Sequence, residues 1–303
     1  MEVVELAPHG RCARFVAGVA EAFVTLDVGP RIIRYGRVGG PNLLFDAMGA
    51  VDIPNGTHYT FYGGHRLWWG PELWDYSYVP EDDPVEVVQE DGAHRFRSAV
   101  DRFGIQREIA IRVGDSGDLQ VGHRLINRGH DTVEGCTWGL TVMAPGGVCL
   151  IPQEPFQPHN ALLVPARTIS LWSYTNMQDE RWTWGRRVIR LRQMADRPPQ
   201  KCGASVSLGL AAYANGDNVF LKRFDFDPDA TYTDGGCNFE TFTNGDFLEV
   251  EALGPYGAIL PGGAASHGET WYLLDNPGVP EDEDACGDWL SALAQTYRHT
   301  ATR

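Results

Sequence analysis

The sequence predicts an all-β protein with one short helix near its C-terminal end. Gly and Pro account for 35 and 19 of the 303 residues, and this excess predicts many turns between short elements. The apolar fraction is 43%, which is enough for a large core. Strand-like runs recur along the whole chain, whereas only residues 286–299 show helical spacing.

The strand-like runs follow one another in order, and each has β-branched or aromatic residues alternating with small or polar ones. Residues 23–35 contain two such runs, which the Gly29-Pro30 step separates. The next four runs are separated by short polar turns and predict an antiparallel meander: 85–88, 94–100, 105–113 and 119–126. Further runs cover 133–143, 147–151, 187–193, 204–213, 219–224, 247–253 and 270–274. No repeat, linker or low-complexity tract interrupts them, so we expect a single domain over residues 1–303.

The predicted helix lies at 286–299. Its apolar residues recur at three- and four-residue spacing, and the acidic stretch 281–284 before it suits a helix N-terminus. We expect this helix to pack on a sheet. The residues of its apolar face are Trp289, Leu290, Leu293, Ala294 and Tyr297.

The charge balance excludes two classes of partner. The chain has 25 basic and 40 acidic residues and a formal net charge of −15, whereas nucleic acids and anionic membrane surfaces require a basic surface. No apolar run approaches the roughly 20 residues that span a bilayer, and residues 1–11 lack a basic targeting region. We therefore expect a soluble, cytoplasmic protein. The six cysteines show no zinc or redox spacing, which indicates free, mostly buried thiols.

One segment with chemical potential spans residues 59–78. It combines seven large aromatic residues up to Tyr76 with His65, Arg66 and a carboxylate, and Gly63-Gly64 allows a sharp turn before the charged pair. Aromatic faces cover the apolar face of a sugar ring while Arg, His and carboxylates bind its hydroxyls, so the segment favours a sugar cleft. A buried aromatic corner with a satisfied histidine is the alternative. The substrate-binding residues expected here are Arg66, Trp68, Trp69 and Glu72.

A second segment spans residues 232–255. In a strand, Glu249 and Glu251 share one face, and Glu240 lies on the preceding strand-like run. Three carboxylates in this pattern favour a catalytic cluster, with solvent-exposed surface as the alternative. Lys222, in another strand, either supplies a counter-charge to this cluster or is exposed. Asn238 and His267 are the remaining expected substrate-binding residues.

Several short motifs occur along the chain: residues 28–35 and 39–45, Ile126-Asn127-Arg128-Gly129, and the three stretches 247–253, 259–262 and 267–271. With these motifs, the chain resembles the galactose mutarotase (aldose 1-epimerase) superfamily between about residues 25 and 275. The first two stretches look like the beginning of such a protein, and residues 126–129 are similar to its strand that ends in Asn before a polar turn. Residues 247–253, 259–262 and 267–271 resemble its catalytic-Glu strand, its Leu-x-Pro-Gly turn and its last strand. The runs 64–68 and 235–240 look more like a bacterial subfamily than the well-studied mutarotases.

The resemblance implies a β-supersandwich of antiparallel sheets, with a sugar bound on the concave sheet. In the superfamily a Glu accepts the proton of the anomeric hydroxyl and a His protonates the ring oxygen, which opens the ring. Glu251 matches the catalytic Glu best, His65 is the counterpart of a cleft His, and Arg66 is a hydroxyl clamp. The family's Asn-His-x-Tyr motif has no match, because residues 137–145 read TWGLTVMAP.

Three functions follow as hypotheses. The first is a sugar 1-epimerase with His65 as acid and Glu251 as base. The second is a glycan-cleaving enzyme on the same fold, either a hydrolase that uses Glu240 and Glu251 or a lyase. The third is a carbohydrate-binding protein without catalysis. The expected partner is a sugar or oligosaccharide, a homodimer is left open, and no cofactor or metal ion is predicted because no potential ligands have a trustworthy spacing.

Overall fold

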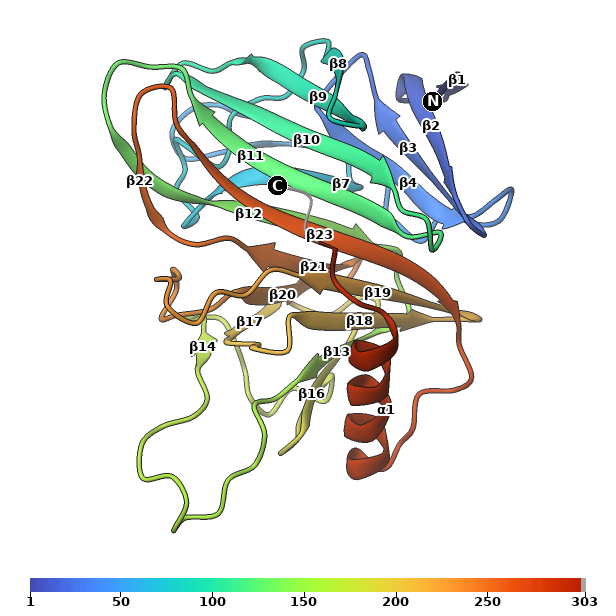
Figure 1. Cartoon of the computed structure of the whole chain (residues 1–303), viewed down its shortest axis with the longest axis vertical. Coiled ribbons are helices and arrows are strands. Elements are labelled where there is room, and N and C mark those ends of the chain that lie inside the picture. The colour runs from blue at the N-terminus through green and yellow to red at the C-terminus, as the bar shows by residue number, and fades with distance from the viewer. Residues whose placement is uncertain (301–303) are drawn as a thin grey trace.

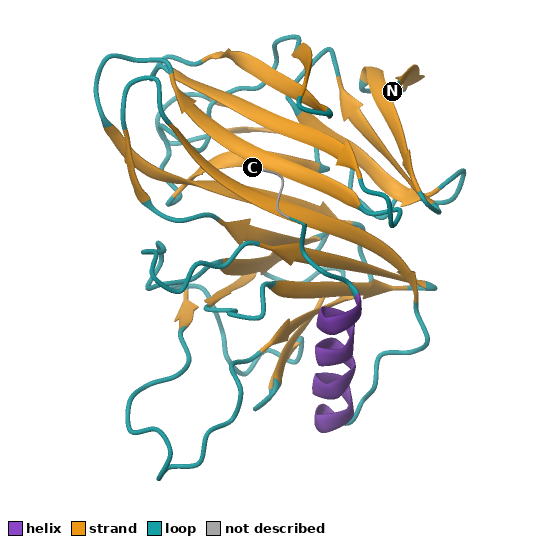
Figure 2. Cartoon of the chain, in the orientation of Figure 1, coloured by secondary structure: helices purple, strands orange, loops and turns teal. Residues whose placement is uncertain are grey.

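Two large antiparallel sheets form the molecule in a computed structural model that describes residues 1–300 (Figures 1 and 2). The first sheet has eleven strands in the order β1-β2-β3-β4-β7-β12-β21-β20-β17-β14, with β22 paired to β12. Its strands are β1 (Glu2–Leu6), β2 (Gly10–Ala17), β3 (Ala20–Thr25), β4 (Arg31–Arg37), β7 (His65–Gly70), β12 (Val133–Met143), β14 (Ile169–Leu171), β17 (Gln200–Ala204), β20 (Phe239–Thr243), β21 (Leu248–Leu253) and β22 (Gly257–Ile259).

The second sheet has ten strands in the order β15-β16-β13-β18-β19-β23-β11-β10-β9-β8. Its strands are β8 (Glu86–Glu90), β9 (Ala93–Val100), β10 (Ile105–Val113), β11 (Leu119–Asn127), β13 (Val148–Pro152), β15 (Trp182–Trp184), β16 (Val188–Arg192), β18 (Leu210–Asn215), β19 (Asn218–Phe224) and β23 (Ala264–Asp275). The predicted meander is confirmed as β8 to β11, which are consecutive neighbours in this sheet.

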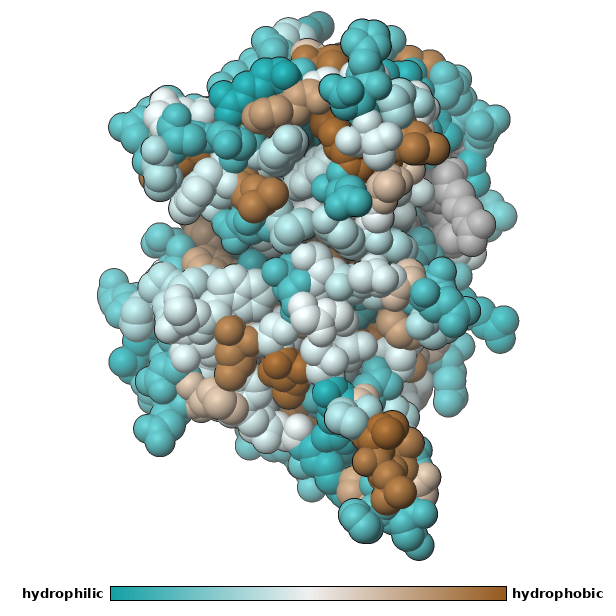
Figure 3. Space-filling view, turned by 90° about the vertical axis from the view of Figure 1, so that its left-hand side faces the viewer, coloured by the Kyte–Doolittle hydropathy of each residue, from teal (hydrophilic) through white to brown (hydrophobic). Residues whose placement is uncertain are grey.

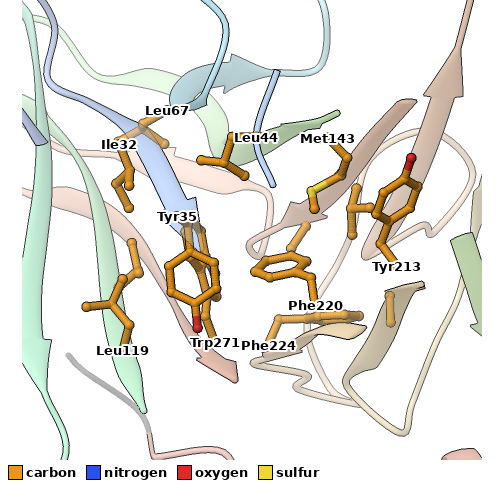
Figure 4. Close-up of a cluster of buried hydrophobic side chains, with 14 of the residues drawn as sticks. Ile32, Tyr35, Leu44, Leu67, Leu119, Met143, Tyr213, Phe220, Phe224 and Trp271 are labelled. Atoms are coloured by element: carbon orange, nitrogen blue, oxygen red, sulfur yellow. The ribbon is translucent and has the colours of Figure 1, made fainter. Parts of the chain in front are cut away.

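The core lies between the two sheets. Along each strand, alternate side chains point inward, and these positions carry the apolar residues of both sheets. Tyr35 of the first sheet packs edge-on against Trp271 and Phe220 of the second, with ring centroids 5.3 and 5.7 Å apart (Figure 4). The predicted all-β sandwich is therefore confirmed.

The helix α1 (Glu283–Thr296) covers part of the outer face of the second sheet (Figure 1). Its buried residues Cys286 and Leu290 pack on the outward side chains of β13, β16, β18 and β19. The helix begins three residues before the predicted start, because the Asp282 side chain caps it by accepting a hydrogen bond from the Ala285 N–H at 2.8 Å. Within residues 1–300, no helix has both the length and the apolar character needed to cross a bilayer.

The outer face of the first sheet has a different cover. The hairpin of β5 (Gly49–Asp52) and β6 (His58–Phe61) packs over it, and Tyr59 joins Trp68 and Trp138 in an aromatic cluster. This hairpin leaves part of the sheet open beside it, where a cavity forms.

The predicted strand at 204–213 is wrong. A turn interrupts it: β17 ends at Ala204 and β18 begins at Leu210, in the opposite sheet. Gly209 has φ +57°, a left-handed conformation that glycine adopts readily and that breaks the apolar run. The long connection between β13 and β14 hangs below both sheets (Figure 1) and carries the strongly exposed Leu163, and apolar surface is visible on the lower projection in Figure 3.

Candidate functional site

A cavity of about 450 Å³ lies on the outer face of the first sheet. Strands β7, β12, β17, β20 and β21 supply its floor, and the hairpin β5–β6 and neighbouring loops supply its walls. Aromatic side chains dominate the lining, and the charged groups lie among them. The aromatic residues of the lining include Phe61, Trp68, Tyr78, Trp138, Tyr174 and Phe242.

Strand register brings the polar floor residues together. Leu140 of β12 lies opposite Arg66 of β7 on one side and Glu251 of β21 on the other. Glu240 of β20 is directly opposite Glu251. Because side chains alternate between faces with period two, Arg66, Glu249, Glu251 and Glu240 all point outward from the sheet. The prediction that Glu249 and Glu251 share one face is confirmed.

Arg66 and Glu249 form an ion pair at the cavity floor. The Arg66 Nη2 donates to Glu249 Oε1 at 3.0 Å, and both side chains are at least nine-tenths buried. The guanidinium also lies 4.3 Å from the centre of the Trp68 ring. Burial alone would lower the pKa of Arg66, but Glu249, together with Tyr59 and Glu81, raises that pKa above its ordinary value. The pair therefore presents a fixed carboxylate and a fixed donor to the cavity.

Lys201 forms a second charged cluster with Glu240 and Glu251. Its Nζ lies 2.8 Å from Glu240 Oε2 and 3.5 Å from Glu251 Oε2. Trp138 Nε1 donates to Glu251 Oε2 at 2.9 Å, and the ammonium lies 4.5 Å from the Trp138 ring centre. Lys201 lines the cavity, whereas the two carboxyl groups lie buried behind it. Within residues 1–300, the Oε1 atoms of Glu240 and Glu251 have no hydrogen-bond partner.

One ammonium cannot neutralise two carboxylates, and this imbalance sets the protonation of the cluster. Burial raises the pKa of Glu240 to about 8 and that of Glu251 to about 7, although Lys201 opposes the shift in both. Burial alone would lower the pKa of Lys201, but Glu251 and Glu240 raise it well above its ordinary value. The cluster therefore keeps a carboxyl group protonated near neutral pH.

Glu72 and Tyr78 form a third polar pair at the cavity rim. Glu72 is exposed, and the Tyr78 hydroxyl donates to its Oε1 at 2.5 Å. Burial, together with the Glu72 charge, raises the pKa of Tyr78, so the phenol stays protonated. The expected cleft residues Arg66, Trp68 and Glu72 thus all line the cavity.

His65 lies on the other face of the same strand, inside the sandwich. It is fully buried, its Nδ1 is 2.9 Å from Thr141 Oγ1, and its Nε2 is 2.7 Å from His123 Nε2. Strand alternation separates it from Glu251, because Arg66, not His65, shares the outward face. The expected acid–base pair of His65 and Glu251 is therefore not formed, and no histidine of residues 1–300 lines the cavity.

Three other expected substrate-binding residues also lie inside the sandwich. Trp69 packs in the core against Tyr76. His267 is hydrogen-bonded through Nδ1 to Thr137 Oγ1 at 2.7 Å. Lys222 forms an ion pair with Glu269, at 3.0 Å, and not with the outward carboxylates. Lys222 belongs to a strand that the sequence predicted, His267 to the last strand that the resemblance implies, and Trp69 to a segment for which no strand was predicted. All three point to the inner face.

Asn238 is the fourth expected substrate-binding residue outside the cavity. Its side chain bonds the backbone N–H and C=O of Val206, at 2.7 and 3.1 Å. These two bonds tie Asn238, directly before β20, to the turn that follows β17.

Sequence reasoning missed several residues that build the cavity. Lys201 lies in no recognisable sequence motif. It reaches the carboxyl groups because β17 pairs with β20, and this pairing cannot be read from the sequence. Trp138 lies in a segment that lacks clustered polar residues. Glu249 did carry a signal, because it shares a face with Glu251, but its pairing with Arg66 is a long-range contact.

Comparisons with known proteins identify the architecture. Neither a scan against protein-family models nor a comparison with curated protein sequences finds a match. Among solved structures, a galactose mutarotase-like protein from Lactobacillus casei is similar with a TM-score of 0.56 and 10% identity, covering 87% of this chain and 100% of that one. A galactose mutarotase-like protein from Clostridium acetobutylicum has a TM-score of 0.55 and 10% identity over 90% of this chain and 98% of that one.

A further similar structure broadens the context of this architecture. A TPR-domain containing protein from Parabacteroides distasonis has a TM-score of 0.59 and 12% identity, over 91% of this chain but only 48% of that chain. Identities this low compare backbone architecture, and activity must be argued from the site itself. The resemblance seen in the sequence is thus confirmed in the backbone: this chain has the galactose mutarotase-like fold.

Proposed function

We propose that this protein is a sugar 1-epimerase that interconverts the two anomers of a monosaccharide-sized ligand. The observation that carries the proposal is Glu249: a carboxylate that lines an aromatic cavity, is held by Arg66, and lies near a cluster that holds a proton at neutral pH. Two similar solved structures are described as galactose mutarotase-like proteins, which supports the same class of chemistry.

Anomer exchange requires a proton acceptor at the anomeric hydroxyl and a proton donor at the ring oxygen. In this proposal, Glu249 is the acceptor, because it is the floor carboxylate that reaches the cavity. The Lys201 ammonium is the donor, since it alone in its cluster lines the cavity. On ring opening, Glu240 or Glu251, at 2.8 and 3.5 Å from the Lys201 Nζ, replaces the proton that Lys201 gives to the ring oxygen. On ring closure the ring-oxygen hydroxyl returns this proton through Lys201 to the carboxylate, and Glu249 returns the other proton to the anomeric oxygen.

The lining fits a sugar. A cavity of about 450 Å³ lies in the range of roughly 300–1,000 Å³ that small-ligand sites occupy. Tyr174 lines the cavity and is 44% exposed, so it offers ring surface to the apolar face of a pyranose. Arg66, Glu249 and Glu72 offer donors and acceptors to its hydroxyl groups.

Glycan cleavage is the less favoured alternative on the same cavity. A hydrolase places two carboxyl groups on either side of the scissile bond. Glu240 and Glu251 instead lie side by side on adjacent strands, share Lys201, and are buried behind it. That arrangement suits proton storage better than attack from two sides.

The test is a substrate screen by saturation-transfer NMR. Neutral aldoses, amino sugars, uronates and sugar phosphates are each incubated with the protein, and the exchange rate between anomers is measured. We expect accelerated exchange for one sugar class. Binding without acceleration for every sugar, observed as line broadening, would contradict the epimerase and leave a carbohydrate-binding protein.

A further inference from the structure

A group of histidines and a carboxylate meets between the two sheets, away from the cavity. His65 comes from β7 of the first sheet, whereas His123 comes from β11 and His267 and Glu269 from β23 of the second. All four are nearly or fully buried. We call them the interior cluster. Neither the proposed epimerase chemistry nor the sugar cavity uses this group.

The potential ligand atoms of three residues of the interior cluster converge, and His267 lies beside them. One nitrogen each from His65 and His123 and one oxygen of Glu269 all lie within 4.8 Å of one another. His65 Nε2 is 2.7 Å from His123 Nε2, and His267 Nε2 is 3.4 Å from Glu269 Oε1. Two nitrogens on a tetrahedral zinc ion stand roughly 3.3 Å apart, given bonds of about 2.0 Å. A separation of the His65 and His123 rings by about half an ångström would therefore admit an ion.

The far sides of two rings are already anchored. Thr141 Oγ1 lies 2.9 Å from His65 Nδ1, and Thr137 Oγ1 lies 2.7 Å from His267 Nδ1. Hydrogen bonds at Nδ1 fix a ring so that Nε2 points at a metal, which is the usual arrangement around metal-binding histidines. Both threonines come from β12, so one strand orients two of the rings.

Gly139 of the same strand leaves room where these side chains meet. A Cβ at this position would lie 2.7 Å from Glu269 Oε1, 3.2 Å from His267 Nε2 and 3.3 Å from the His65 ring. A backbone strand without a side chain therefore faces atoms of three residues of the cluster. This is a second observation, independent of the ligand distances, that the chain keeps space at the point of convergence.

We infer that the interior cluster is a structural site for a four-coordinate transition-metal ion, of which Zn²⁺ is the best match, that ties the two sheets together. Imidazole nitrogens with one carboxylate are a ligand set that suits zinc. The residues come from both sheets, so a bound ion would cross-link the sandwich at its centre. Complete burial gives no route for a substrate, and the role is therefore structural.

Lys222 is the competitor for this site. Its Nζ lies 3.0 Å from Glu269 Oε2 and 3.1 Å from Oε1. The Lys222 ammonium contacts both oxygens of Glu269. A metal ion must therefore displace the ammonium or bind the carboxylate together with it. Lys222→Met removes the competitor and leaves Glu269 as an uncompensated buried charge, so this variant should gain more stability from metal than the wild type does.

The experiment refolds the full chain with and without Zn²⁺ or Co²⁺ and measures metal content, the Co²⁺ absorption spectrum and the melting temperature. The wild type should hold one ion per chain, show the intense visible bands of four-coordinate Co²⁺ and melt at a higher temperature with metal. Thr141→Val should weaken binding about 10- to 100-fold, since it removes the partner of His65 Nδ1. Lys222→Met should bind more tightly.

His123→Gln removes a ligand, and His9→Gln is its matched control, because His9 is a buried histidine outside the cluster. Metal binding should be lost in the first variant and kept in the second. Wild-type protein that refolds without metal and shows neither Co²⁺ bands nor a higher melting temperature would overturn the inference. Equal metal binding by the wild type and His123→Gln would also overturn the inference. If His123→Gln fails to fold, the Lys222→Met variant decides: the inference is overturned if metal does not raise its melting temperature.

Discussion

Glu240 and Glu251 lie directly opposite each other on β20 and β21, and both are buried on the outer face of the first sheet. Like charges in opposite positions of a sheet are destabilising, and burial adds the cost of desolvation. Lys201, from the next strand, contacts both carboxyl groups. This three-residue cluster is therefore destabilising for the fold. In the proposed reaction it has a function, because it keeps a proton available next to the cavity.

Removal of the shared cation should destabilise the protein in a pH-dependent way. Lys201→Met leaves two buried carboxyl groups without a counter-charge, a change that costs about 3–5 kcal/mol when one partner of a buried pair is lost. At pH 5 the cost should be smaller, because both groups are then protonated. Urea denaturation at pH 5 and 8 measures the difference. The control is Arg197→Met, which breaks an exposed pair with Glu180 and should cost less than about 1 kcal/mol.

Glu240→Gln should remove a loss of stability that the wild type shows as the pH rises. Burial raises the pKa of Glu240 to about 8 in the folded protein, against 4.5 ordinarily. The folded state therefore binds a proton that the unfolded chain releases, and the stability due to this group falls as the pH rises from 4.5 through 8. Relative to the variant, the wild type should lose at most about 1.4 kcal/mol per pH unit. A difference that stays constant between pH 5 and 8 would contradict the raised pKa.

Arg66→Lys should weaken the proposed reaction while the charge is kept. The shorter ammonium loses the fork geometry that reaches Glu249 and the contact with the Trp68 ring. We expect kcat/KM to fall about 10- to 100-fold, corresponding to one charged hydrogen bond of roughly 1.5–3 kcal/mol. Steady-state anomer exchange measures this effect. Unchanged kcat/KM would show that Arg66 does not position the reacting carboxylate.

Trp138→Phe should shift the pH dependence of the proposed reaction. The change keeps an aromatic ring but removes the indole N–H that Glu251 accepts at 2.9 Å, so the pKa of Glu251 should rise further. Because Glu251 acts in its protonated form, the basic limb of the pH–rate profile should move to higher pH. Trp184→Phe is the matched control, since its indole N–H donates to the Met177 carbonyl and not to a carboxylate of the cluster. Equal profiles for both variants would contradict a role for Glu251.

Much of the fold was predictable because it depends on local patterns. The meander β8 to β11 follows from alternation and polar turns, and α1 follows from its apolar spacing and acidic N-terminus. The interruption between Ala204 and Leu210 could not be predicted, because an apolar run that crosses from one sheet to the other looks continuous in the sequence. The left-handed conformation of Gly209 ends the turn at this point, so that a new strand begins.

The site was predictable only in part, because the sequence does not show which face of each strand points outward. Both key segments were identified, and Arg66, Trp68 and Glu72 do line the cavity. Which face of a strand looks inward depends on pairing across the sheet, and a shift of one residue exchanges His65 for Arg66. Lys201 enters through the pairing of β17 with β20, which has no local signature.

The central claim is that Glu249, on the outer face of the first sheet, is the proton acceptor in a sugar 1-epimerase. The most direct test is the anomer-exchange rate, with the sugar found by the screen, for wild type, Glu249→Gln and Glu86→Gln. Glu86 is an exposed residue of the edge strand β8 and provides the same charge change at a remote place. Loss of about 10²- to 10⁴-fold in Glu249→Gln, with full activity in Glu86→Gln, is the predicted result. Wild-type exchange rates in a folded Glu249→Gln variant would contradict the account.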